Sequence, residues 1–219
     1  MFMIAKTVLL VLSALFPIVN PLGGAPIFLS LTNYYSTDQR KLLSWRIAIN
    51  SLLLLVGSFF VGTHILAFFG ISIPVVQVGG GLVVMSAGWK MLNQNEDNEA
   101  REDVHHSVDP RDLSTRAFYP LTLPLTVGPG SISIAITLGA NVRHEDILFS
   151  VIGAVIGMLL VAISVYLCYA FADRLASILG ETAMTIIMRL SSFLLVCIGF
   201  QILWNGFSAL LKALPMFHH

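Results

Sequence analysis

Apolar residues fill five long charge-free stretches of the chain, and polar segments separate them. The stretches cover residues 7–31, 47–89, 117–142, 147–172 and 190–211. About 20 apolar residues suffice to cross a bilayer as a helix, so four stretches predict one crossing each. Residues 47–89 are long enough for two crossings, and Phe69-Gly70-Ile71-Ser72-Ile73-Pro74 supplies a turn between them. The pattern therefore predicts an all-α membrane protein with six transmembrane helices.

Helix breakers occupy the middle of the first stretch, in the sequence Pro17-Ile18-Val19-Asn20-Pro21-Leu22-Gly23-Gly24-Ala25-Pro26. Proline removes a backbone donor and clashes with the preceding turn, and glycine lowers helix stability. Inside a bilayer, freed backbone groups are tolerated only where protein or a wet cavity receives them. We therefore expect a broken helix here, with the break at a functional site.

The second half of the chain repeats this proline pattern. Prolines stand at positions 17, 21 and 26 and again at 120, 124 and 129, a constant offset of 103. Each half holds three spans, so the second half must enter the membrane in the opposite sense. The prediction is two inverted three-helix repeats, 1–92 and 117–219, with broken helices 1 and 4 and an acidic linker at 93–116. Secondary transporters use this layout and bind substrate between the breaks. The alternative is that the inverted repeat is retained in a protein that does not transport.

Composition agrees with a membrane protein. The chain is 56% hydrophobic and 11% charged, and its mean hydropathy is +0.84. The formal net charge is zero, so no nucleic acid partner is expected. Cys168 and Cys197 lie in apolar stretches and suggest neither a disulfide nor a metal site. No nucleophile and base pair can be named, so the chain is not expected to be an enzyme, and no cofactor is expected.

Basic residues are distributed unequally between the predicted loops. One side of the membrane would carry Arg40, Lys41, Arg46, Lys90, Arg101, Arg111, Arg116, Arg174 and Arg189. The other side would carry only Lys6, Arg143 and Lys212. The positive-inside rule places the first group in the cytoplasm and both termini outside. The linker is then cytoplasmic, and the pair His105-His106 within it is a weak metal candidate.

The two breaks supply the candidate substrate-binding residues. At the first they are Asn20, Pro21, Gly23 and Gly24, and at the second Thr122, Thr126, Gly128, Gly130 and Ser131. Half-helices that begin after a break aim free N–H groups at an anion, and carbonyls freed by the break can receive an ammonium group. No Asp or Glu lies inside a span. A neutral or zwitterionic substrate is therefore expected, although small residues such as Ser131 can also serve helix packing.

Two ionisable residues are further candidates. His64 lies inside an apolar run and is a candidate proton site, with an interfacial role as the alternative. Arg189 stands at the start of the last span, where it can pair with a substrate carboxylate or anchor the helix at the interface.

The motifs at Asn20-Pro21-Leu22-Gly23, at residues 69–74 and at Pro120 to Gly130 resemble those of the MarC family of bacterial inner-membrane proteins, which is related to SnatA-type transporters. The resemblance covers the whole chain. It implies a six-span carrier of glycine, alanine or similar amino acids in the bacterial inner membrane. One three-span unit would rock against the other. The rival hypothesis is a non-transporting membrane adaptor that acts through the 93–116 loop. Assembly as a homo-oligomer is left open.

Overall fold

The computed structural model describes residues 2–93, 110–142 and 147–213, and every element in these ranges is a helix. In chain order the elements are α1 Phe2–Val19, α2 Pro21–Leu31, α3 Thr37–Phe68, α4 Ile73–Leu92, α5 Pro110–Arg116, the π-helical segment η2 Ala117–Thr126, α6 Pro129–Ala140, α7 Ile147–Ala170 and α8 Ala172–Lys212.

Several helices are long and apolar enough to cross a membrane. Five single spans qualify: Met3–Leu31, Thr37–Phe68, Ile73–Leu92, Ile147–Ala170 and Thr182–Lys212. The pair Leu113–Thr126 and Pro129–Ala140, bent by 73°, makes a sixth if it is counted as one span. The predicted all-helical membrane class is confirmed, with five to six spans in the described part of the chain.

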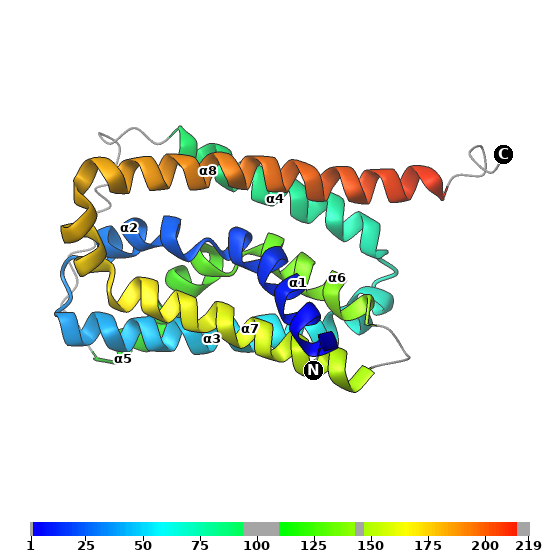
Figure 1. The fold of residues 1–219 in the computed structure, drawn as a ribbon, viewed down its shortest axis with the longest axis horizontal. Coiled ribbons are helices and arrows are strands. Elements are labelled where there is room, and N and C mark those ends of the chain that lie inside the picture. Colours follow the sequence, from blue (N-terminus) through cyan, green and yellow to red (C-terminus); the bar gives the residue numbers. More distant parts are fainter. Residues whose placement is uncertain (1, 94–109, 143–146, 214–219) are drawn as a thin grey trace.

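The helices run roughly along the long axis of the molecule (Figure 1). Helices α4 and α8 lie along one edge, α1 and α2 lie in the middle, and α3 and α7 lie along the opposite edge. The corners between α2 and α3 and between α7 and α8 share one end of the bundle, while the turn from α3 to α4 lies at the other. The two ends of the bundle therefore differ in which connections they carry.

The buried core joins α1, α2, α3, η2, α6 and α7, together with α5 at Leu113 and the start of α8. Its largest fully buried side chains include Leu15, Phe28, Leu43, Leu55, Met158 and Tyr169. Among the described residues, α4 contributes none to this cluster and α8 only its start, at Ala172 and Leu175. Over the rest of their length α4 and α8 pack chiefly against each other. The molecule is thus built from one buried core and an α4–α8 pair that joins this core at the start of α8.

Small residues let α4 and α8 approach closely. A Cβ atom on Gly206 would lie 2.6 Å from the carbonyl oxygen of Pro74, and one on Gly88 would lie 2.8 Å from that of Ser192. Between them, a Cβ on Gly81 would lie 2.6 Å from the carbonyl oxygen of Gly199. Contacts recur every seven residues on both helices, which run antiparallel. This spacing keeps one seam of small residues facing the partner helix.

Helix ends extend beyond the charge-free stretches. Helix α3 begins at Thr37, where Ser36 and Gln39 form a capping box. Helix α8 follows α7 directly and changes direction at Gly180, whose φ is 75°. Helix α5 occupies the last residues of the segment predicted as a linker, and its Leu113 is buried. Charge-free stretches mark only the part of a helix in hydrocarbon, so they miss ends that carry charged residues.

Candidate functional site

The first break lies at Asn20, between α1 and α2. Its backbone is left-handed, with φ 48° and ψ 59°, a conformation that Asn adopts more readily than most residues. The Oδ1 atom of Asn20 accepts a hydrogen bond of 3.2 Å from the N–H of Gly23, so the side chain caps α2. A side chain on Gly23 would overlap the Asn20 amide. The residue pair therefore fixes how α2 leaves the break.

The same Asn20 side chain keeps one donor unused. Its Nδ2 atom is buried and has no hydrogen-bond partner among the described residues. Leaving a buried donor unpaired costs about 1–3 kcal/mol. An acceptor on a bound ligand would remove this cost, which makes the Asn20 amide a candidate binding group.

The second break combines η2 with the start of α6. The hydroxyls of Thr122 and Thr126 donate hydrogen bonds to the carbonyls five residues earlier, at 2.6 and 2.7 Å. They satisfy carbonyls in a segment where Pro120 and Pro124 provide no N–H. Helix α6 then starts at Pro129 with no side-chain cap. Its first-turn amides are left for other acceptors.

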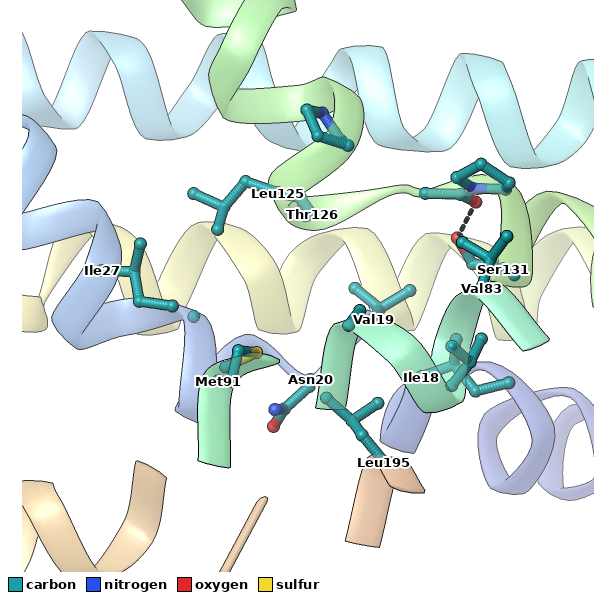
Figure 2. A pocket seen from close by; sticks show the side chains of 17 residues that line it. Ile18, Val19, Asn20, Ile27, Val83, Met91, Leu125, Thr126, Ser131 and Leu195 are labelled. Carbon is teal, nitrogen blue, oxygen red and sulfur yellow. Dashed lines mark hydrogen bonds between the residues drawn. The ribbon is translucent and has the colours of Figure 1, made fainter. Parts of the chain in front are cut away.

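A cavity of about 140 Å³ lies between the two breaks. Figure 2 shows Asn20 on one of its sides and Thr126 and Ser131 on another. It is lined by Ile18, Val19, Asn20, Gly24, Ile27, Val83, Val84, Ala87, Met91, Pro124, Leu125, Thr126, Gly128, Pro129, Gly130, Ser131 and Leu195. An apolar protein cavity of roughly 150 Å³ is known to accept benzene, which like alanine has six non-hydrogen atoms. Among the residues that the structure describes, no ionisable side chain lines this cavity.

The structure brings together six of the residues that the sequence suggested for substrate binding. They are Asn20, Gly24, Thr126, Gly128, Gly130 and Ser131. The hydroxyl of Ser131 donates to the Gly128 carbonyl at 3.0 Å.

The other suggested residues do not line the cavity. Pro21, Gly23 and Thr122 are buried close by in the chain, where they shape the two breaks. His64 and Arg189 are exposed on α3 and α8 and are not among the lining residues.

Tyr169 of α7 links the two breaks, and sequence reasoning missed this residue. The residue is 1% exposed, and its ring stacks on Phe28 with a centroid distance of 4.7 Å. Its hydroxyl lies 3.1 Å from the Thr126 hydroxyl of the second break. A Cβ on Gly24 of the first break would lie 2.5 Å from the same hydroxyl. A tyrosine in an apolar stretch gives no local signal of such a role.

Together these features define a class of protein: an integral membrane protein of five to six spans with a small, uncharged cavity where two helices are interrupted. A family model described as MarC family integral membrane protein matches residues 5–211. The chain therefore belongs to the MarC family.

Curated relatives cover almost the whole chain. An inner membrane protein named MarC from Salmonella arizonae is 32% identical over 214 residues, covering 94% of this chain and 96% of the relative. The MarC proteins of Citrobacter koseri and Escherichia coli O1:K1 are 32% and 28% identical over 213 residues, with the same two coverages. No solved structure matches the chain significantly.

Proposed function

We propose that this protein transports small neutral amino acids such as glycine or alanine across the bacterial inner membrane by alternating access. The observation that carries this proposal is the uncharged cavity that joins both helix breaks. The printed names of the relatives, inner membrane protein MarC, support the location.

The cavity suits a zwitterion because it holds the ends of helices with opposite polarity. The positive end of α6, at Gly130 and Ser131, favours a carboxylate, and the buried Asn20 amide adds a donor. The negative end of α1, at Ile18 and Val19, lines the same cavity and favours an ammonium group. A substrate with one charge of each sign and no net charge matches this arrangement.

The packing supports the inverted repeats expected from the prolines. If α2, α3 and α4 correspond to α6, α7 and α8, the contact of α4 with α6 has its counterpart in that of α8 with α2. Gly81 and Gly88 then correspond to Ser192 and Gly199, each at an offset of 111. The contact of Gly81 with Gly199 is therefore matched by that of Ser192 with Gly88.

The same packing indicates that the unit which moves during transport is not a whole repeat. Helix α7 of the second repeat packs on α1 and α3 of the first within one buried core. Rocking one repeat against the other would break these contacts. Movement of the α4–α8 pair across α2 and α6 would preserve them, so we propose that this pair moves.

In the structure the α4–α8 pair packs closely against α6. The Ser133 hydroxyl of α6 donates to the Val76 carbonyl of α4 at 3.0 Å, and a Cβ on Gly80 would lie 2.6 Å from that of Ser133. At the proline offset, Ser133 corresponds to Ser30 of α2, which is exposed and has no hydrogen-bond partner among the described residues. In the other state of the alternating-access cycle, we expect Ser30 of α2 to contact α8 near Ser191. Ser191 corresponds to Gly80 at the offset of 111.

Transport by purified protein in liposomes tests the function. Labelled glycine or alanine should accumulate to a higher level in these liposomes than in protein-free liposomes. Asn20→Gly should abolish this flux, because glycine tolerates the left-handed backbone but removes the amide. His64→Leu, outside the cavity, is the matched control and should transport normally. Absence of flux for every small amino acid would overturn the function, and normal flux in Asn20→Gly would remove the site assignment.

A further inference from the structure

The breaks supply both polar and apolar groups to the cavity, whereas α4 and α8 supply apolar ones. Its amide and hydroxyl side chains belong to the two breaks: Asn20, Thr126 and Ser131. Among the described residues, α4 and α8 contribute the apolar side chains of Val83, Val84, Ala87, Met91 and Leu195 and no polar side chain. A zwitterion whose two charged groups are held by the breaks therefore presents its side chain to α4 and α8.

Val84 and Leu195 are the most firmly held residues of this apolar wall. They are 5% and 6% exposed. Val84 occupies the space beside Gly130, where any Cβ would overlap it. The Cβ of Leu195 would lie 2.9 Å from a Cβ on Gly88, so Leu195 sits in the α4–α8 seam. Both side chains are packed against neighbouring helices, which limits how far the wall can recede.

We infer that Val84 and Leu195 determine which side chain the site accepts, and that it selects small apolar side chains. This inference rests on the proposed transport of neutral amino acids. The wall excludes large side chains by its depth. It also disfavours hydroxyl-bearing side chains, because it offers no hydrogen-bonding side chain to replace the water that they lose.

Binding by the purified full-length protein tests the size limit. Competition against labelled L-alanine would give relative affinities for L-valine and L-leucine. Val84→Ala and Leu195→Ala should each raise the affinity for a larger side chain relative to alanine by about 10-fold or more, since a methylene in an apolar pocket is worth that order of discrimination. The neighbours Leu82→Ala and Leu194→Ala are matched controls, because both are exposed and neither lines the cavity.

A second variant tests the polarity of the wall without changing its shape. Val84→Thr keeps the branched side chain and adds a hydroxyl, so it should raise the affinity for L-serine relative to L-alanine several-fold. It also guards against the case in which Val84→Ala does not fold.

The outcomes separate the inference from the function it rests on. If no amino acid competes with the wild-type protein, the proposed function fails. If alanine binds but its ratios to valine, leucine and serine stay at wild-type values in all three cavity variants, the function stands and the inference is overturned.

Discussion

The hydroxyl oxygens of Thr126 and Tyr169 lie 3.1 Å apart inside the protein, where both residues are almost completely buried. Thr126 belongs to the second helix break, and the Tyr169 hydroxyl also lies against Gly24 of the first break. One side chain of α7 therefore holds the two sides of the cavity at a fixed separation.

Gly24→Ala should destabilise the protein because the new methyl group would lie 2.5 Å from the Tyr169 hydroxyl. Overpacking of this kind typically costs about 1–3 kcal/mol. Tyr169→Phe in the same chain should restore part of the loss, since the next ring atom lies 3.3 Å away. The measurement is the unfolding midpoint in detergent. Gly57→Ala, with nothing within 4 Å, is the control and should not lower the midpoint.

Thr126→Val should lower stability by about 1–3 kcal/mol because it leaves the buried Tyr169 hydroxyl without its partner. A double-mutant cycle with Tyr169→Phe isolates this contribution from lost packing. We expect the double variant to lose less than the sum of the two single variants. Strict additivity would show that the hydroxyl pair contributes nothing to stability.

The three consecutive glycines of α4 should respond differently to alanine. Gly79→Ala should be neutral or stabilising, since nothing lies within 4 Å and alanine favours helix. Gly81→Ala should destabilise by about 1–3 kcal/mol, because its methyl group would meet the backbone of α8 at Leu203 and Gly199. The methyl group of Gly80→Ala would meet the Ser133 side chain and should push α4 away from α6. Equal unfolding midpoints for all three variants would contradict the close α4–α8 packing.

Arg40 should matter more to stability than its ion-pair partner. Its Nε atom donates to the carbonyls of Thr32 and Tyr35 at 3.0 and 3.1 Å, and Nη1 pairs with Asp173 at the start of α8. We expect Arg40→Ala to cost about 1–3 kcal/mol through the lost bond to the Tyr35 carbonyl, whereas the Thr32 carbonyl still accepts from the Tyr35 N–H. The half-exposed Asp173→Asn should cost at most about 1 kcal/mol. Arg40→Lys should not restore stability, because lysine lacks the planar fork. Unfolding midpoints of the three variants check this order.

Local features of the sequence accounted for the helical membrane class and for the spans to within one, and helix-breaking residues pointed to the segments around Asn20 and Pro124. Asn20 and Gly24 at the first break, and Thr126, Gly128, Gly130 and Ser131 at the second, were suggested by helix breakers alone, and the structure places all six around one cavity. The inverted relation of the two halves stays a prediction that the packing supports. The membrane orientation of the termini and the role of residues 94–109, which include His105 and His106 and lie outside the described residues, also stay predictions.

The sequence by itself determined the membrane class, the number of spans to within one, and the places where helices are interrupted, because hydrophobicity and helix breaking act over a few neighbouring residues. Only the tertiary structure decided that Val84, Leu195 and Tyr169 face inward while His64 and Arg189 do not. The physical reason is that lipid and protein interior are equally apolar. The face of a membrane helix that packs inward is therefore chosen by the fit between helices rather than by a contrast in polarity along the chain.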